Sequence, residues 1–338
     1  MKKTLLTLIA LALALALLGS CTAQSGAPAT GSPAETAGPT ASAEPEKTAE
    51  PAETQTADIE PLPFSALPAP LESMTPEEYP IVDGSTATRP LSQALAYTFT
   101  GITDMLELDF LADHSTTDES YDNLIEKRAD LLLVYEPSPD TKRRIEESGV
   151  QLLMTPIGRD ALVFLVNEKN PVKSLTTEQL QGIYSGKIKN WKELGGEDLP
   201  IVAFQRPENS GSQTLMEKLV MQGRAMAEAP AELRQSEMGD LIRAVASYEN
   251  EGSAIGYSVY YYASRMYTQK GVRLLAVNDV EPSGESIARK EYPFLNEFYA
   301  VVREGEALDE RVARLFAAIT GEVGKKIIEV MGYVPVSE

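Results

Sequence analysis

The stretch Arg206-Pro207-Glu208-Asn209-Ser210-Gly211-Ser212 follows the apolar run Ile201-Val202-Ala203-Phe204, which reads as a buried strand. From Ser210 to Met221 the pattern is that of a helix, so the stretch is a strand-to-helix turn. A helix N-terminus offers free backbone N–H donors and a partial positive charge. Arg206 adds a planar fork for two oxygens, and Gly211 permits close backbone approach. Such a turn is suited to capturing an oxyanion.

Two further strand-to-helix turns carry hydroxyls and small residues. Asp83-Gly84-Ser85-Thr86-Ala87-Thr88 follows the short strand 80–83, and Glu136-Pro137-Ser138 follows the apolar strand 129–135. Taken singly, each turn has the alternative reading of plain helix capping, for which Ser, Thr and Asp are the usual residues. In open α/β sheets ligands gather at the carboxyl ends of strands, where all three turns would lie.

Strands and helices alternate along most of the chain, which predicts an α/β fold with largely parallel sheets. Besides the strands already named, we expect strands at 151–156, 161–166, 272–277 and 298–302. We expect helices at 90–99, 120–127, 175–184 and 210–221, and one at 309–330 that is interrupted near Gly321.

Several classes of function are disfavoured by composition. The chain has 338 residues and a formal net charge of −20, which argues against nucleic-acid binding and against a polybasic membrane surface. It holds one Cys and one His, so we expect no disulfide framework, no zinc site and no cofactor. It lacks the P-loop and Gly-x-Ser-x-Gly patterns. An enzyme remains an alternative, with His114-Ser115 as the one adjacent base and nucleophile.

The N-terminus indicates export and lipidation. Lys2 and Lys3 precede the apolar run 5–18, which is too short for a membrane span and typical of a signal peptide. The run ends in Leu18-Gly19-Ser20-Cys21, so the sole cysteine lies where a lipobox requires it. We expect a signal peptide at 1–20 and a lipidated Cys21 opening a disordered Ala/Pro/Glu/Thr-rich tether at 21–77. The alternative is a plain signal peptide with an incidental cysteine.

From about Tyr79 onward the chain resembles the PstS-like phosphate-binding lipoproteins of ABC transporters. The most specific motifs are Gly186-Lys187-Ile188 with Asn190-Trp191, and the turn from Arg206 to Ser212. Ala254-Ile255-Gly256-Tyr257 and Gly332-Tyr333-Val334-Pro335 also match. The resemblance implies a type II periplasmic-binding-protein fold: two α/β lobes with a ligand cleft between them. The implied lobes are 78–166 plus 264–338, and 167–263.

The resemblance also implies which residues bind the ligand. The family's first-loop hydroxyls fall on Ser85 and Thr86, and its second-loop serine falls within 114–117, where we choose Ser115. Its carboxylate, which accepts the proton of hydrogen phosphate and so rejects sulfate, falls on Glu136, with Ser138 behind it. Its Arg…Ser-Gly-Thr element falls on Arg206, Ser210, Gly211 and Ser212, with Ser in place of Thr. Glu208 stands where the family has an acid that pairs with the arginine.

The function that follows is capture of phosphate by a monomeric lipoprotein anchored on the extracytoplasmic face of the cell membrane. Its partners would be inorganic phosphate and an ABC transporter permease. The carboxylate position departs from the family pattern, because Glu136 is longer than Asp and is followed by Pro137. A binder of another small oxyanion, or a surface lipoprotein used for sensing or interaction, is therefore the alternative.

The lipid anchor can be tested by Cys21→Ala. No other residue of the chain can carry the thioether lipid, since Cys21 is its only cysteine. We expect metabolic labelling with a radioactive fatty acid to label the wild-type chain and not the variant. Equal labelling of both proteins would contradict the lipoprotein assignment.

Overall fold

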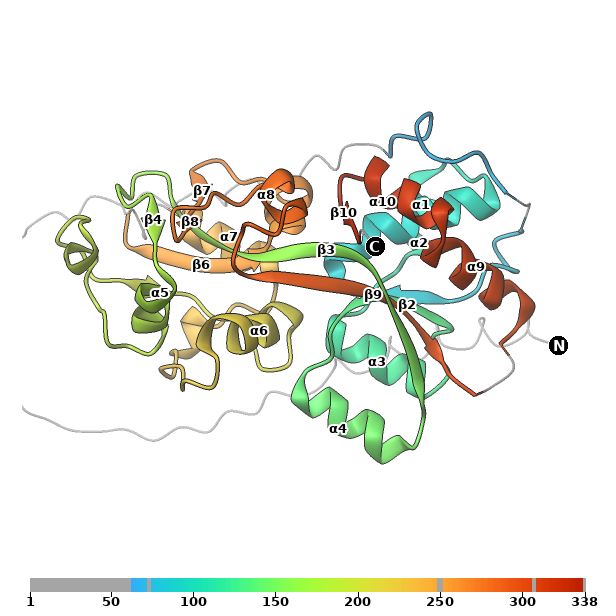
Figure 1. The fold of residues 1–338 in the computed structure, drawn as a ribbon, viewed down its shortest axis with the longest axis horizontal. Coiled ribbons are helices and arrows are strands. Elements are labelled where there is room, and N and C mark those ends of the chain that lie inside the picture. Colours follow the sequence, from blue (N-terminus) through green and yellow to red (C-terminus); the bar gives the residue numbers. More distant parts are fainter. Residues whose placement is uncertain (1–61, 72–73, 248–251, 306–307, 337–338) are drawn as a thin grey trace, which may run out of the picture. The chain divides into compact units, whose positions relative to one another are not determined.

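One long strand, β3 (Leu152–Asn167), runs through the middle of the main sheet in this computed structural model (Figure 1). The structure describes residues 62–71, 74–247, 252–305 and 308–336, all within the unit Gln55–Glu338. The expected signal peptide, Cys21 and the tether as far as residue 61 lie outside the described residues. The expectation of a disordered tether is wrong for the described part of 62–77, because Leu62, Leu67 and Met74 are buried in the hydrophobic core. None of the helices in the described ranges combines the length and apolar character that a membrane span requires.

The main sheet has the strand order β1-β2-β9-β3-β6-β5. Strand β3 pairs with β9 along Leu152–Ala161 and with β6 along Leu162–Val166, so it joins two halves of the sheet. Strands β7 and β10 also pair with β3, and β4 pairs with β8 in a separate two-stranded sheet. The strands are β1 (Val82–Gly84), β2 (Leu131–Tyr135), β4 (Ser174–Leu175), β5 (Val202–Ala203), β6 (Ala254–Val259), β7 (Val272–Leu274), β8 (Ala276–Val277), β9 (Leu295–Arg303) and β10 (Val334–Pro335).

The expectation of largely parallel sheets is wrong. Within the described residues, parallel pairing joins β1 to β2, β5 to β6 and β4 to β8, whereas every neighbour of β3 is antiparallel to it. The cause is that β3 and β9 both span the middle of the sheet and run in opposite directions. The two strands expected at 151–156 and 161–166 are the single strand β3, in which a register shift between Pro156 and Gly158 absorbs the apparent break.

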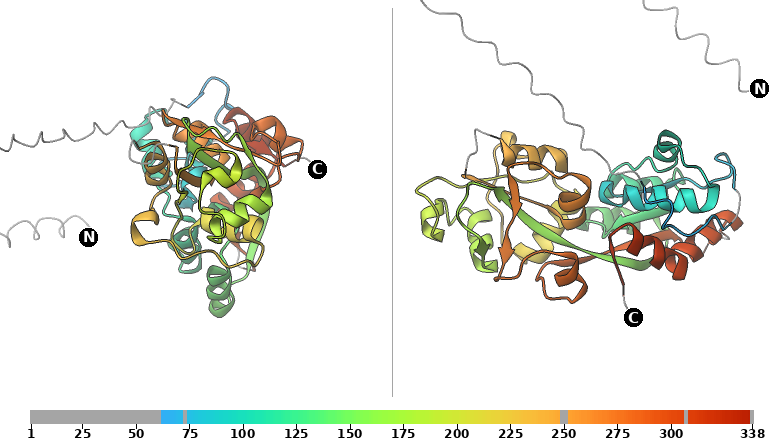
Figure 2. Two further views of the ribbon diagram at one scale, coloured as in Figure 1. Left: turned by 90° about the vertical axis from the view of Figure 1, so that its left-hand side faces the viewer. Right: turned by 90° about the horizontal axis from the view of Figure 1, so that it is seen from above.

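The expected helices are present, with others that the sequence pattern did not indicate. Helix α10 packs on α1 and α9, and α9 packs on β3 and β9 (Figure 2). The helices are α1 (Arg89–Thr100), α2 (Met105–Leu111), α3 (Thr117–Ile125), α4 (Pro139–Ser148), α5 (Thr177–Tyr184), α6 (Gly211–Leu215), α7 (Met238–Ala246), α8 (Gly284–Ala288), α9 (Glu310–Thr320) and α10 (Glu322–Val330). Short 3₁₀ helices span 86–88, 191–194 and 231–233, and π-helical segments span 216–221 and 262–266.

The division into lobes stays a prediction, and one observation bears on its boundary. The expected division assigns residues from 264 onward to the first lobe. Strand β8 nevertheless pairs with β4, and β7 pairs with the last residues of β3, next to the range 167–263. The chain therefore returns toward the β1–β2 half of the sheet through β9 rather than directly after β6.

Local capping explains where the helices of interest begin. Thr116 accepts a hydrogen bond from the backbone N–H of Glu119 and so starts α3, and Ser210 accepts one from Gln213 and starts α6. Helix α1 begins after the 3₁₀ turn at 86–88 with Pro90 in its first turn, which suits proline because it lacks an N–H. These caps fix where α3 and α6 begin, and α6 follows strand β5 as the sequence predicts.

Gly84 tests how tightly the first of these turns is packed. A Cβ at this position would lie 1.9 Å from the carbonyl oxygen of Leu133 and 3.0 Å from the ring of His114. Overpacking of this kind costs about 1–3 kcal/mol, so Gly84→Ala should lower the free energy of unfolding in urea by about that amount. Gly284→Ala is the matched control, since a Cβ there meets no atom within 4 Å. Equal stability of Gly84→Ala and wild type would contradict the packing described.

Candidate ligand-binding site

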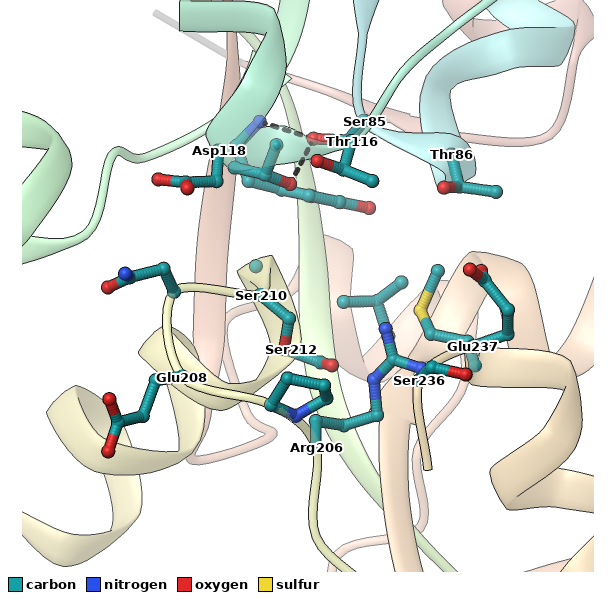
Figure 3. Close-up of a pocket in the computed structure, with 17 residues that line it drawn as sticks. Ser85, Thr86, Thr116, Asp118, Arg206, Glu208, Ser210, Ser212, Ser236 and Glu237 are labelled. Atoms are coloured by element: carbon teal, nitrogen blue, oxygen red, sulfur yellow. Dashed lines mark hydrogen bonds between the residues drawn. The ribbon is translucent and has the colours of Figure 1, made fainter. Parts of the chain in front are cut away.

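A pocket of about 230 Å³ lies where several turns that lead into helices converge (Figure 3). One side is formed by the turns after β1 and before α3, and the facing side by the turns before α6 and α7. Its lining residues are Ser85, Thr86, Thr116, Thr117, Asp118, Tyr135, Arg206, Pro207, Glu208, Asn209, Ser210, Gly211, Ser212, Ser236, Glu237, Met238 and Val259. Pockets for drug-sized ligands are usually about 300–1,000 Å³, so this one fits a small ligand.

Ser85 joins the elements on the first side of the pocket. Its side chain is buried, and its Oγ lies 2.7 Å from the Thr117 Oγ1 and accepts a hydrogen bond of 3.1 Å from the backbone N–H of Tyr135. The hydroxyl thus ties the turn after β1 to the start of α3 and the end of β2. Thr86 and Thr116 border the pocket beside it.

Arg206 dominates the facing side. The residue is 9% exposed, and neither its Nε nor its Nη1 has a hydrogen-bond partner. Its backbone N–H is held by the Tyr257 Oη at 3.0 Å, and Tyr257 in turn donates to the side chain of Gln213. Burial lowers the pKa of Arg206, although an arginine remains protonated in proteins. A buried, unpaired guanidinium is costly unless an anion joins it.

Two neighbours of Arg206 complete the facing side. Ser212 is 4% exposed, and its Oγ is also without a partner. A Cβ at Gly211 would lie 2.6 Å from the Thr117 Oγ1, so the two sides of the pocket approach closely at this position. A larger residue would push them apart, which explains why glycine stands there.

Seven of the expected site residues line this one pocket: Ser85, Thr86, Arg206, Glu208, Ser210, Gly211 and Ser212. Glu208, however, forms no ion pair with Arg206 among the described residues. Figure 3 shows its carboxylate directed away from the guanidinium. The expected pairing of these two side chains is therefore not present.

Ser115, Glu136 and Ser138 do not line the pocket. The Ser115 hydroxyl donates to the carboxylate of Asp83, at 2.8 Å to its Oδ2. Ser138 caps α4, where its Oγ accepts a 3.0 Å hydrogen bond from the backbone N–H of Thr141. Each of these two serines thus bonds to the protein itself rather than facing the pocket.

The structure corrects the placement of Glu136. Its carboxylate accepts a 2.6 Å hydrogen bond from Lys142 and another from Lys218. Partial burial raises the pKa of Glu136, but the hydrogen bonds from the two lysines outweigh it and the net shift is downward. A carboxylate neutralised by two ammonium groups outside the pocket is not positioned to accept a proton from a ligand inside it.

Sequence reasoning missed part of the lining. Thr116 and Thr117 lie within the segment 114–117, to which the family resemblance assigned a ligand-binding hydroxyl. The resemblance did not distinguish them from Ser115. Asp118 lines the pocket while its Oδ1 accepts from Arg144 at 2.7 Å and from the Thr141 hydroxyl. Ser236 and Glu237 precede α7. The apolar residues of α7 recur at helical spacing, and this signal could have revealed a further turn that leads into a helix. No cluster of potential metal ligands occurs among the residues that the structure describes.

His114 supports the site from behind. Its Nδ1 lies 2.9 Å from the carbonyl oxygen of Ser85, and its Nε2 lies 2.8 Å from the Ser92 Oγ. Since a carbonyl only accepts, Nδ1 carries the proton and Nε2 accepts from the serine in the neutral ring. Burial lowers the pKa of His114 to about 4, although the hydrogen bond to Ser85 and the nearby carboxylate of Asp83 both act to raise it. The single histidine thus holds the Ser85 turn in place and does not line the pocket.

Comparison with known proteins bears on the family and the fold. A family model described as a PBP superfamily domain matches residues 46–319. The phosphate-binding protein PstS of Bacillus subtilis is 29% identical over 196 residues, which cover 57% of this chain and 62% of the relative's length.

Two solved structures share the fold. A putative phosphate ABC transporter substrate-binding protein with bound phosphate from Clostridium perfringens matches with a TM-score of 0.56 and 25% identity, over 76% of this chain and 98% of that one. An ABC-type phosphate transport receptor from Vibrio cholerae matches with a TM-score of 0.54 and 22% identity, over 75% and 98%. The expected α/β binding-protein fold is confirmed.

His114 gives the stability a defined pH dependence. Its pKa in the folded chain, about 4, lies below the usual 6.5, so its stabilising contribution is complete above pH 6.5 and is lost as the pH falls toward 4. Because the ring is only partly buried, we expect a loss on the order of 1–3 kcal/mol. His114→Gln should remove this part of the pH dependence of unfolding in urea.

The difference between wild type and His114→Gln is the quantity to measure. Burial raises the pKa of Asp160 to about 6, so Asp160 changes stability in the opposite direction over the same pH range in both proteins. A wild-type-minus-variant difference that stays constant from pH 7 to 4 would contradict the role given to His114.

Proposed function

We propose, from the premise that this chain belongs to the PBP superfamily, that it captures phosphate outside the cytoplasm for an ABC importer. The family consists of binding proteins rather than enzymes. The chain's assignment to the substrate-binding proteins of phosphate ABC transporters rests on the relatives described above.

The observation that carries the proposal is the unpaired guanidinium of Arg206. Its free Nε and Nη1, together with the free hydroxyl of Ser212, supply three donor atoms to a small pocket. The N-terminus of the helix that starts at Gly211 adds backbone donors. A tetrahedral oxyanion can accept from all of these groups at once, and its charge would balance the arginine.

Phosphate is the preferred oxyanion for two reasons. The relative from Clostridium perfringens holds phosphate, and the curated relative from Bacillus subtilis is named for binding it. Three carboxylates also border the pocket, those of Asp118, Glu208 and Glu237. A fully ionised anion such as sulfate would be repelled by them, whereas hydrogen phosphate can donate its proton to one of them.

Glu237 is the carboxylate we propose for this proton. Burial lowers the pKa of Arg206 and the Glu237 carboxylate acts to raise it, so this carboxylate lies within electrostatic reach of the guanidinium. Figure 3 shows Glu237 on the same side of the pocket as Arg206. Asp118 is less suited, because one of its oxygens already accepts from Arg144 and Thr141.

The lipid anchor at Cys21, the permease partner and the monomeric state remain part of the proposal. A lipidated cysteine carrying two acyl chains would give stable membrane attachment, and the tether would allow the binding unit to reach a permease. The alternative is that the protein serves in sensing. If it serves an importer, deleting its gene should reduce phosphate uptake by cells, whereas uptake should not depend on a protein used only for sensing.

Removing Arg206 should weaken phosphate binding most. A hydrogen bond to a charged group contributes about 1.5–3 kcal/mol, or roughly tenfold to a hundredfold in affinity per bond. We expect Arg206→Ala to lose at least about a hundredfold in calorimetric titration with phosphate, and Arg206→Lys to recover only part, since lysine lacks the fork. Arg234→Ala is the control: Arg234 is exposed, pairs with Glu228 and does not line the pocket. Unchanged binding by Arg206→Ala would overturn the site.

Sulfate discrimination tests the proton acceptor. Glu237→Gln replaces an acceptor with a group that also donates, so sulfate should compete with phosphate more effectively than in wild type. Glu136→Gln should leave discrimination unchanged, because Glu136 faces Lys142 and Lys218 outside the pocket. Competition titrations in which Glu136→Gln admits sulfate and Glu237→Gln does not would reverse the assignment.

A further inference from the structure

A second cavity of about 340 Å³ lies beside β3 and β9 and shares no lining residue with the pocket described above. Its walls come from four places in the chain: the strands β3 and β9, the end of α6 with the helical turn at 216–221, the turn after β2, and the turn after α8. The lining residues are Glu136, Arg159, Leu215, Lys218, Leu219, Lys290, Leu295, Asn296, Glu297 and Tyr299.

Arg159 is the feature of this cavity that requires an explanation. It stands in β3 directly opposite Glu297 of β9 and is 6% exposed. No hydrogen bond or ion pair of its guanidinium occurs within the described residues, not even with Glu297. The carboxylate of Glu297 instead accepts a long hydrogen bond of 3.5 Å from the Tyr299 hydroxyl. A guanidinium that lines a cavity and has no carboxylate partner is free to receive an anion there.

The other charges of the cavity leave a net positive balance. Arg159, Lys218 and Lys290 face two carboxylates, those of Glu136 and Glu297. Glu136 is already shared between Lys142 and Lys218 and so cannot neutralise Arg159. Lys290 brings a further cation to the same cavity. Its φ of 60° is a left-handed conformation that lysine rarely adopts.

We propose that this cavity is a second binding site for a small oxyanion, gripped by Arg159 and Lys290. The planar guanidinium suits two oxygens of a phosphate, sulfate or carboxylate group, and Lys290 adds a mobile ammonium from the rim. Leu215, Leu219 and Leu295 form the apolar part of the lining. The volume is near the lower limit for organic ligands, and a small anion fits within it.

The test uses the full chain with Arg206→Ala, which silences the first pocket, and inorganic phosphate and sulfate as separate calorimetric probes. We expect one saturable site that binds phosphate better than sulfate, because the Glu297 carboxylate in the lining repels a fully ionised anion and can accept the proton of hydrogen phosphate. Adding Arg159→Met or Lys290→Ala should weaken this binding by about tenfold or more, since each removes a charge-assisted contact. Lys325→Ala, an exposed lysine of α10, should have no effect.

Folding is controlled separately. Arg159→Met with Arg206 intact should keep the phosphate affinity of the first pocket, which shows that the chain still folds. The second site is disproved if the Arg206→Ala chain binds neither anion saturably, or if its binding is indifferent to both Arg159→Met and Lys290→Ala. Should the first pocket bind no phosphate at all, wild type itself reports on the second site, and the same two variants decide.

Discussion

The guanidinium of Arg206 is buried without a carboxylate partner, and its Nε and Nη1 have no hydrogen bond within the described residues. Its backbone is fixed by Tyr257, whose ring packs against Tyr184 and Phe164 in the core. The nearest acids act on it through space and form no ion pair with it among the described residues. An arginine paired within the protein would bind an external anion weakly, because the anion would have to displace its partner. The unpaired state therefore favours ligand capture at a cost in stability.

The two sides of the pocket come from distant parts of the chain, and the sheet brings them together. Strand β3 pairs with β9 over its first part and with β6 over its second, so the turn after β1 and the turn after β5 belong to one continuous sheet. Gly211 then lets the start of α6 approach Thr117 at the start of α3. The ligand site thus depends on a topology in which long strands cross the middle of the sheet, and not on any single motif.

Much of this could be predicted from the sequence, for physical reasons that differ between residues. The turn from Arg206 to Ser212 combines its donors within seven consecutive residues, so local spacing was sufficient. Ser85 and Thr86 follow a strand and precede a helix, which also is local information. The prediction that Glu136 binds the ligand was wrong because Glu136 forms an ion pair with Lys218. Lys218 is far away in sequence, and only the fold brings the two side chains together.

Other failures have the same origin. Ser115 and Thr116 are adjacent hydroxyl residues, and the choice between them depends on Asp83, which engages Ser115 across the turn. The parallel sheet was expected because strands alternate with helices, yet β3 and β9 return through the sheet in opposite directions. Direction of pairing and long-range charge partners are properties of the assembled fold, and local patterns do not contain them.

A crystal structure of the chain grown with phosphate tests whether Arg206 receives an oxyanion in the pocket between the turns. We expect phosphate within hydrogen-bond distance of the Arg206 Nε and Nη1 and the Ser212 Oγ, with Glu136 still bound to Lys142 and Lys218. Phosphate in contact with Glu136, or an Arg206 that is paired with Glu208 or Glu237 while phosphate lies elsewhere, would contradict it.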